Sequence, residues 1–497
     1  MTRATASRNL FPSPTVPVLV LLVLVAGLTV PVLASGSMYR SDAEHTGVYD
    51  DGGTRPNGVL KWTARTDAQD SRVIHQPSVM DGVVYFGSSE MKVYAVYASN
   101  GTRKWVSPKL NTTKIWGSPA VADGHVIVSG DGVYGLDAAT GAVKWSQFPF
   151  PIDSGLLPKN VPNPPTVSGN RVFVSDGGDY GNIVAALSTS GEVLWVKETQ
   201  EWTGWTVRMS GLTHVAAHAG TLYLSCGGDY FQVDAGTGGG VHLRNRFWAA
   251  PDFWYTGGPA WVDGVLYLKV ANNTHSGAGA KTATDGRQLW FNPFLGKNTG
   301  KFAVSDVAVG DGKVFLGCGN ASVGQVWALN AADGTTRWNF TVLNTPVADR
   351  KFVLPAYANG VVYATGSNRL YALNAADGSK RWEWSNGTPL FSPPAIADGT
   401  VFVAGSDGKR GALYAIGGQG GAAPVQPIPG GTGDPQDRDG DGRCEDVNGN
   451  GRPDFADVVL FFNQMTWIGE NEPVAAFDFN GNGRIDFADV VALFNGL

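Results

Sequence analysis

The sequence predicts an all-β eight-bladed propeller followed by a small α-helical domain. A phrase that contains Asp-Gly, a short alternating strand, a second Gly turn and then Trp recurs through the middle of the chain at intervals of about 40 to 53 residues. A period of this length with several short strands per unit is typical of propeller blades. Near the C-terminus, a twelve-residue loop rich in Asp, Asn and Gly occurs twice. Each copy is followed by apolar residues at helical spacing.

Residues 1–34 are interpreted as an export signal peptide. Two arginines precede an apolar run from Val16 to Leu33, and Ala34 ends a small-residue cleavage pattern. An uncleaved anchor is the alternative, because a run of about 18 apolar residues is long enough to cross a bilayer. We expect no transmembrane span after cleavage, and a protein that is secreted or held at the cell surface.

Each repeat unit has the pattern of short antiparallel strands. Pairs such as Asp81-Gly82 suit tight hairpin turns because Gly accepts a positive φ, and residues 361–365 alternate as a strand does. Each last strand ends in a Trp with a face large enough to pack between neighbouring blades. The sequence places these units at Trp105, Trp145, Trp195, Trp248, Trp290, Trp338 and Trp382.

The two ends of the repeat array predict how the ring closes. The last unit runs from Pro393 to Ile416 without a final Trp strand, whereas residues 58–62 form a last strand without the rest of a blade. We expect this N-terminal strand to complete the final blade, because closure removes open sheet edges. Eight blades are predicted over residues 38–417, and seven is the alternative if one degenerate unit is a loop.

The repeat resembles that of the pyrroloquinoline-quinone (PQQ)-like propellers, and residues 38–47 resemble the opening segment of that family. Its members include quinone-dependent dehydrogenases and non-enzymatic propellers such as the envelope lipoprotein that helps outer-membrane protein assembly. The dehydrogenases hold the quinone under a disulfide between adjacent cysteines, but Cys226, Cys318 and Cys444 are far apart in sequence. We expect a non-catalytic propeller that binds a protein or ligand. A PQQ-dependent dehydrogenase-like quinoprotein and a glycan-binding surface protein are the alternatives.

Charge and composition separate the C-terminal region from the rest of the chain. The net charge is −6, yet residues 434–497 alone carry −9, which predicts bound cations. No basic stripe indicates binding to nucleic acid. Residues 418–433 are rich in Gly and Pro and poor in large apolar side chains, which predicts a linker.

Two loops within residues 434–497 have the spacing of EF-hand calcium sites. Oxygen-bearing side chains stand at positions 1, 3, 5, 9 and 12, a Gly at position 6 permits the sharp turn, and position 7 offers its backbone carbonyl. We expect the apolar stripes after each loop to pack together as the core: Phe455, Val458, Val459 and Phe462, and Phe487, Val490, Val491 and Phe494. The candidate ligands are Asp446, Asn448, Asn450, Arg452, Asp454 and Asp457 in the first loop, and Asp478, Asn480, Asn482, Arg484, Asp486 and Asp489 in the second.

The duplicated loops with Asp at position 12 resemble a dockerin, a module that binds cohesin domains, over about residues 444–497. This resemblance implies calcium as the cofactor and a cohesin-like partner. Dockerins often carry Ser-Thr at positions 10 and 11, whereas this chain has Phe455-Ala456 and Phe487-Ala488. The partner, protein or polysaccharide, therefore stays open. A third candidate calcium site consists of Asp437, Asp439, Asp441 and Glu445.

Overall fold

The computed structural model describes most of the chain after residue 36. The described residues are 37–49, 55–73, 75–115, 117–149, 163–176, 183–203, 212–226, 229–243, 255–271, 276–295, 303–319, 324–342, 354–366, 368–417, 425–438, 443–472, 474–480 and 484–497. The expected signal peptide and residues 418–424 of the expected linker lie outside them. Within the described part of the chain, no helix is long and apolar enough to cross a membrane.

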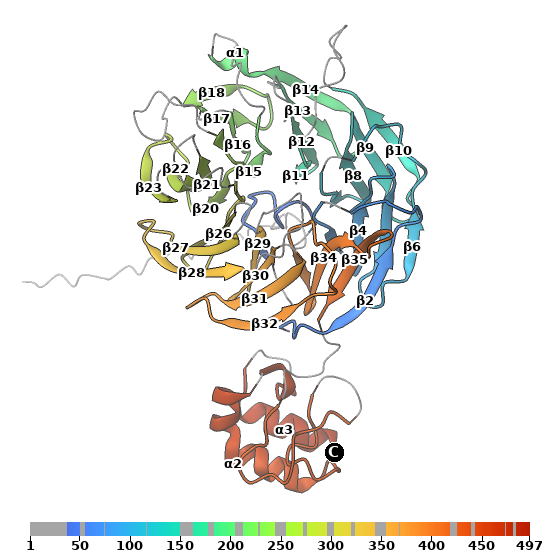
Figure 1. The fold of residues 1–497 in the computed structure, drawn as a ribbon, viewed down its shortest axis with the longest axis vertical. Coiled ribbons are helices and arrows are strands. Elements are labelled where there is room, and N and C mark those ends of the chain that lie inside the picture. The colour runs from blue at the N-terminus through green and yellow to red at the C-terminus, as the bar shows by residue number, and fades with distance from the viewer. Residues whose placement is uncertain are drawn as a thin grey trace, which may run out of the picture. The chain divides into compact units, whose positions relative to one another are not determined.

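The described strands form eight sheets arranged in a ring (Figure 1), which confirms the predicted number of blades. The first strand of each blade lies nearest the axis, and the last strand is the most exposed. Blades one to four consist of β3 (Ser78–Met80), β4 (Val83–Gly87), β5 (Val93–Tyr97) and β6 (Arg103–Val106); β7 (Ala120–Ala122), β8 (His125–Ser129), β9 (Val133–Asp137) and β10 (Val143–Gln147); β11 (Thr166–Ser168), β12 (Arg171–Ser175), β13 (Ile183–Ser188) and β14 (Val193–Glu198); and β15 (Ala216–His218), β16 (Thr221–Cys226), β17 (Asp229–Asp234) and β18 (Gly240–Leu243).

Blades five to eight repeat the antiparallel order. They consist of β20 (Ala260–Val262), β21 (Val265–Ala271), β22 (Ser276–Thr282) and β23 (Gln288–Leu295); β25 (Ala308–Gly310), β26 (Lys313–Gly319), β27 (Gly324–Asn330) and β28 (Thr336–Val342); β29 (Leu354–Ala358), β30 (Val361–Gly366), β31 (Arg369–Asn374) and β32 (Lys380–Trp384); and β33 (Ala395–Ala397), β34 (Thr400–Ser406), β35 (Gly411–Ile416) and β2 (Leu60–Arg65). Short strands β19 (Tyr255–Thr256) and β24 (Ala303–Val304) extend blades five and six, and β1 (Val48–Tyr49) lies parallel to β29.

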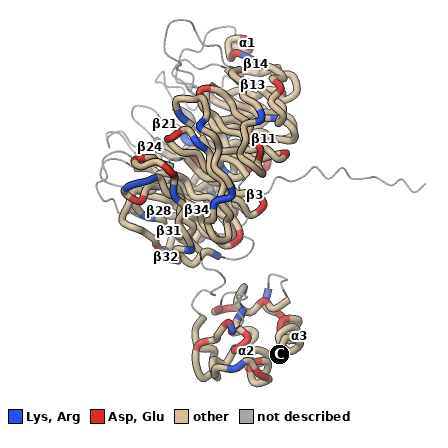
Figure 2. The backbone as a smooth tube through the Cα atoms, turned by 90° about the vertical axis from the view of Figure 1, so that its right-hand side faces the viewer, with Lys and Arg blue, Asp and Glu red and all other residues tan. Residues whose placement is uncertain are grey.

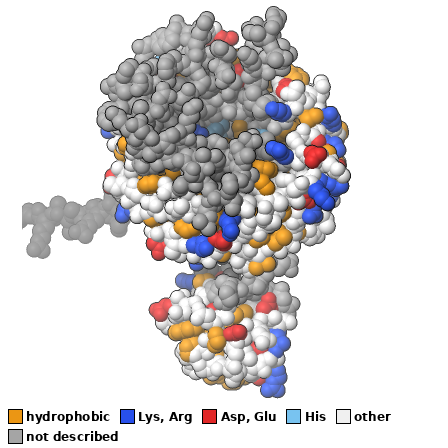
Figure 3. All heavy atoms as spheres, viewed as in Figure 1, with side chains coloured by type: hydrophobic (Ala, Val, Ile, Leu, Met, Phe, Trp, Pro, Cys, Tyr) orange, Lys and Arg blue, Asp and Glu red, His pale blue; other side chains and the backbone are white. Residues whose placement is uncertain are grey.

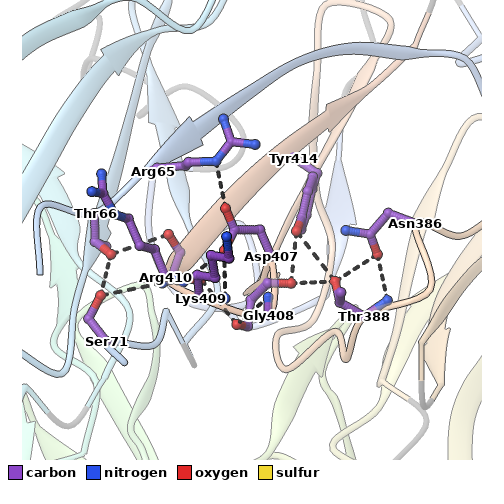
Figure 4. A network of polar contacts seen from close by, with 12 residues as sticks. Arg65, Thr66, Ser71, Asn386, Thr388, Asp407, Gly408, Lys409, Arg410 and Tyr414 are labelled. Carbon is purple, nitrogen blue, oxygen red and sulfur yellow. Dashed lines mark hydrogen bonds and ion pairs between the residues drawn. The ribbon is translucent and has the colours of Figure 1, made fainter. Parts of the chain in front are cut away.

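Strand β2 completes blade eight, as the sequence predicted. Trp62 of β2 stands opposite Ala415 of β35, so the two ends of the propeller share one sheet. The Arg65 Nε donates to Asp407 Oδ2 at 2.6 Å and ties β2 to the β34–β35 hairpin (Figure 4). Burial works against ionisation of Asp407, but the bonds from Arg65 and from two backbone N–H groups outweigh it and lower the pKa to about 2. The closing strand is therefore held by backbone and side-chain bonds together.

A repeated tryptophan contact joins neighbouring blades. The Trp105 indole N–H donates to the carbonyl of Ala138 at 2.9 Å, and the ring covers Gly141 of the next blade. A Cβ on Gly141 would lie 2.4 Å from that ring, and its φ of +76° is also one that favours Gly. Equivalent bonds run from Trp62 to Ala98, Trp145 to Thr189, Trp195 to Ala235, Trp290 to Ala331, Trp338 to Ala375 and Trp382 to Pro56.

Blade four departs from this pattern. Val241 of β18 stands opposite Gln232, the register at which the other blades carry Trp, so the expected Trp at the end of this strand is wrong. Trp248 lies outside the described residues. The Gln232 side-chain amide donates to the carbonyl of Ala283, which is equivalent to that of Ala138 in the regular contact. An amide therefore replaces the indole N–H. The short helix α1 (Thr199–Thr203) packs Trp202 on this blade, and its indole N–H donates to the carbonyl of Gly238 at 3.2 Å.

Residues 37–49, here called the axial segment, run through the centre of the ring (Figure 1). Arg40 is 1% exposed, and its guanidinium donates to the carbonyls of Val307 and Pro355. Backbone N–H groups of inner strands in five blades donate to axial carbonyls: Val121 to Ser37, Ala217 to Ala43, Trp261 to Glu44, Val309 to Thr46 and Tyr357 to Gly47. The segment satisfies the inner edges of these blades as an extra strand would.

The C-terminal module contains α2 (Phe455–Asn471), the 3-10 turn η1 (Val474–Ala476) and α3 (Phe487–Gly496). Its core differs from the predicted one, because each apolar stripe divides between two faces. Val458 and Val490 are buried with Phe461 and Leu493, but the other stripe residues are exposed: Phe455, Val459, Phe462, Phe487, Val491 and Phe494. The prediction that these six side chains form the core is therefore wrong. Phe461 and Leu493, outside the predicted stripe, take their place.

The described part of the expected linker belongs to this module. Ile428 is buried in the module core, and the Gln426 N–H donates to Glu472 at 3.2 Å. The Thr432 N–H donates to the carbonyl of Asn448 at 2.7 Å. Composition placed the boundary after residue 433, but Val425, Ile428 and backbone hydrogen bonds pack residues 425–433 against the module core.

Candidate functional site

The first predicted calcium loop is fully described, and two of its three acids are buried. Asp446 and Asp457 are 0% exposed, and Asn448 is 7% exposed. Positive φ values of +67° and +94° at Gly449 and Gly451 turn the backbone around the Asp446 carboxylate, which accepts the N–H groups of Asn450 and Gly451. The loop therefore wraps its oxygens inward, as a cation site requires.

Positions 9 and 12 of the first loop also begin helix α2. The Asp454 side chain accepts the Ala456 N–H at 2.8 Å as the N-cap, and Asp457 Oδ2 accepts the Asp454 N–H at 2.7 Å in a capping box. The other oxygen of Asp457 accepts the Asn448 N–H at 2.8 Å. The same carboxylate thus links the loop to the helix start.

The electrostatics of this loop favour a bound cation. Burial raises the pKa of Asp457, and the negative charges of Asp446 and Asp454 raise it further. Figure 2 shows acidic residues along the loops of the module with basic residues between them. A divalent ion would remove the repulsion among the three acids, so these residues fit calcium.

The second loop repeats the arrangement around α3. Asp489 Oδ1 accepts the Asn480 N–H at 3.0 Å, and its Oδ2 accepts the Asp486 N–H at 2.8 Å. Asp486 is the N-cap of α3, as Asp454 is of α2. Arg484 at position 7 pairs with Asp486 through Nε at 2.7 Å. Asn482, the candidate at position 5, lies outside the described residues.

Only part of the third candidate site is described. Asp439 and Asp441 lie outside the described residues, and Glu445 accepts the Arg438 N–H at 3.1 Å. Asp437 stays a predicted ligand. The described residues contain no group of three acidic, His or Cys side chains arranged as a preformed metal site. Calcium would therefore also need amide oxygens, such as those of Asn448 and Asn450, and the carbonyl of Arg452.

Helices α2 and α3 present an exposed aromatic face. Phe455, Phe462, Phe487 and Phe494 are 63%, 53%, 59% and 55% exposed. They form two edge-to-face pairs, Phe455 with Phe494 and Phe462 with Phe487, with centroids 6.1 and 6.0 Å apart. Figure 3 shows hydrophobic side chains gathered on the module surface. Clustered, exposed apolar side chains of this kind mark an interaction surface. We call these four residues the aromatic face.

A second polar group is buried where the axial segment meets blades four to six. The Tyr39 hydroxyl donates to Asp306 Oδ2 at 2.7 Å, and the Lys269 Nζ lies 2.9 Å from Asp306 Oδ1. The His214 Nε2 is 3.7 Å from Asp306 Oδ2, and the ring of His45 is 4.9 Å from that of His214. His218, four residues after His214 in the chain, contacts Glu44 at 3.1 Å instead.

This axial cluster holds one ion pair and two neutral imidazoles at neutral pH. Burial lowers the pKa of His214 to about 4, and burial likewise holds the pKa of His45 well below its usual range. Burial acts in the opposite sense on Asp306, but the Lys269 ammonium outweighs it and holds the Asp306 pKa far below its usual range. The cluster therefore anchors the axial segment to three blades.

The described propeller does not fit the quinone that the sequence resemblance raised as an alternative. The axial segment runs through the centre of the ring, and Cys226 and Cys318 belong to blades four and six, which are not neighbours. Cys318 is buried and free, and burial raises its pKa to about 12. We therefore derive no chemistry through a quinone.

Two family models match the chain. The model described as outer membrane protein assembly factor BamB matches residues 109–244 and 324–424, within the propeller. The model described as dockerin type I domain matches residues 444–497, which contain both duplicated loops.

Individual relatives of the propeller have different activities. Outer membrane protein assembly factor BamB of Yersinia pestis is 30% identical over 153 residues, which are 28% of this chain and only 37% of that protein. Tetrathionate hydrolase of Acidithiobacillus ferrooxidans is 24% identical over 374 residues, 66% of this chain and 70% of that protein. The crystal structure of quinohemoprotein alcohol dehydrogenase from Comamonas testosteroni matches with a TM-score of 0.58 at 16% identity, covering 77% of this chain and 80% of that one. Similarity at this level establishes the fold and leaves the activity open.

Proposed function

We propose that this chain, which joins a PQQ-like propeller to a dockerin type I domain, is an exported, non-catalytic protein whose calcium-bound C-terminal module attaches the propeller to a protein partner outside the cytoplasm. The observation that carries the proposal is the aromatic face, which stands beside two loops lined with acids. Four phenylalanines exposed together on a module of this size are typical of a surface that a partner covers.

Calcium would control the aromatic face through the helix starts. Asp454 and Asp457 are candidate ligands, and they also cap α2, which begins at Phe455. Asp486 and Asp489 do the same for α3 at Phe487. Without a cation, the buried acids repel one another and both caps are weakened. Calcium binding should therefore fix the positions of the aromatic rings.

The chemistry of the face indicates an apolar partner surface. The chain has Phe-Ala where dockerins often have Ser-Thr, so recognition should depend on buried aromatic area more than on hydroxyl hydrogen bonds. A cohesin-like domain with an apolar surface in place of polar acceptors fits this description. The propeller is then the part that the module holds in place, and its own role is to bind a protein or ligand.

A direct binding measurement tests the proposal. The chain without residues 1–34 would be titrated by calorimetry against a panel of cohesin domains, once in millimolar calcium and once in chelator. We expect binding only in calcium, and at least about tenfold weaker binding for the double variant Phe455→Ser/Phe487→Ser. The control is Val241→Ser, an exposed apolar residue of the propeller.

Two results would argue against this function. The first is equal binding in calcium and chelator, which would move recognition to the propeller. The second is a double variant that binds as tightly as the wild type while its helix content is unchanged, since the aromatic face would then not be the contact surface.

A further inference from the structure

The described residues before the first calcium loop, 436–438 and 443–445, form two stretches, here called the hairpin, that contact both loops. Gln436 pairs with Asp446 in an antiparallel bridge. On the return side of the hairpin, the Arg443 Nε donates to the carbonyl of Asp478 at 3.0 Å. One short segment thus reaches position 1 of each loop. The two contacts differ in kind. In the first loop the segment contacts the Asp446 side chain, and in the second loop it contacts the Asp478 backbone carbonyl.

Arg438 brings a positive charge to the first loop. Its Nη2 lies 3.4 Å from Asp446 Oδ2, and the Asp446 side chain is completely buried whereas that of Arg438 is 39% exposed. A Cβ built on Gly451 would lie 3.1 Å from the same nitrogen, so the guanidinium lies between positions 1 and 6. It therefore sits against the carboxylate that a calcium ion at position 1 would use.

We propose that Arg438 is an intramolecular counter-ion of the first calcium loop, which competes with calcium for Asp446 and so weakens calcium binding to that loop. The inference rests on the proposed function, because it takes residues 446–457 as a calcium site. A buried carboxylate without a cation is costly, and the guanidinium meets that need when calcium is absent. Calcium must then either displace the Arg438 guanidinium or bind beside its positive charge. Each of these lowers the affinity of the loop for calcium.

At the second loop, the described contact is of a different kind. Arg443 binds the carbonyl of Asp478, and an EF-hand loop takes a backbone carbonyl from position 7 and not from position 1. We therefore expect the two loops to fill at different calcium concentrations, with the first loop filling later. The module would close in two steps, and the second step would order the start of α2.

Calcium titration of charge variants tests the role of Arg438. The full chain, stripped of metal, would be titrated against a chromophoric chelator to give two macroscopic dissociation constants. We expect Arg438→Gln to lower the larger constant about 3- to 10-fold. The control Lys109→Gln removes one exposed positive charge from the propeller and should change this constant less than about twofold. Arg438→Lys, which keeps the charge, should lie between.

A second readout separates competition from a structural role. In chelator, Arg438→Gln should lower the thermal midpoint of the module, and in saturating calcium the midpoint should equal that of the wild type. Lower helix content of Arg438→Gln in calcium, weaker calcium binding by that variant, or an effect equal to that of Lys109→Gln would each overturn the inference. A wild-type chain that binds no calcium would overturn the proposed function as well, so the two failures are distinguishable.

Discussion

The indole N–H of Trp382 donates to the backbone carbonyl of Pro56 at 2.7 Å, across 326 positions of sequence. The same ring covers Gly58, just before strand β2. Blade seven therefore docks on the N-terminal strand with the same Trp–Gly contact that joins the other regular blades. The junction where the ring closes is built like its internal junctions, although its two sides come from opposite ends of the propeller.

We predict that Gly58→Ala destabilises the propeller more than Gly82→Ala. Both glycines have a positive φ, so each substitution should cost about 1 kcal/mol of backbone strain. A Cβ on Gly58 would lie 2.9 Å from the Trp382 ring, whereas a Cβ on Gly82 meets nothing within 4 Å. We expect an additional loss of about 1–3 kcal/mol for Gly58→Ala in chemical unfolding. Equal losses would show that the Trp382 contact does not hold the ring closed.

Adjacent phenylalanines of α2 should respond in opposite ways. Phe461 is fully buried and Phe462 is mostly exposed. Phe461→Ala should lower the free energy of unfolding of the calcium-loaded module by about 3–5 kcal/mol, and Phe462→Ala should change it by less than about 0.5 kcal/mol. Circular dichroism during thermal unfolding measures both. A large loss from Phe462→Ala would place that side chain in the core, as the sequence pattern had indicated.

Removal of the position-12 charge should weaken calcium binding in the first loop. Asp457 touches both the loop and the helix start, so Asp457→Asn should raise the dissociation constant of that loop at least about tenfold and lower the helix content at limiting calcium. Asp434→Asn, at an exposed acid outside the twelve-residue loops, is the matched control. The assignment of this loop as a calcium site would be wrong if both variants bound calcium as the wild type does.

The axial cluster should make the propeller sensitive to acid. The pKa of His214 is lowered from its usual 6.5 to about 4, so the unfolded chain binds this proton more readily than the native one. Stability is therefore fully present above about pH 6.5 and is lost as the pH falls toward 4, by about 3 kcal/mol for this group. Asp42 acts in the opposite sense, since burial raises its pKa to about 7.

A pair of variants isolates the His214 contribution. Urea unfolding at several pH values measures the free energy of unfolding. Between pH 4 and 6.5 this free energy should change less with pH for His214→Gln than for the wild type. Both chains carry Asp42, so its contribution does not affect the difference between them. The matched control is His125→Gln in β8, which removes a His that lies outside the axial cluster. Parallel slopes for His214→Gln and the wild type would contradict the neutral, buried imidazole.

The sequence predicted the ring because each blade repeats the same local rules. Asp-Gly turns, alternating strands and the terminal Trp are decided within one unit, and the unpaired strand at Trp62 had to complete a blade. Blade four escaped this reasoning because its interblade bond comes from Gln232, which carries no aromatic signal. The axial segment also escaped it, because its bonds depend on inner strands that only the closed ring brings together.

The C-terminal module shows a different limit of sequence reasoning. The spacing of Phe455, Val458 and Phe462 fits one side of a helix, but the helix is apolar on two sides, and only packing decides which side is inside. Phe461 and Ile468 form the inner side together with Val458. The ligand positions of the loops were predicted from spacing alone, because an EF-hand loop takes its ligands from set positions, and they stay a prediction.

The pairing of Leu60 with Ile416 in the closing blade has a consequence for how the molecule is made. Strand β2 is synthesised before any complete blade, but its strand partner β35 exists only when the last blade has been made. Contacts between such distant positions form slowly, and unpaired strand edges are prone to aggregate in the interval. The propeller can therefore close only after blade eight has been made. A chain that ended before blade eight would leave the edge of β2 unpaired.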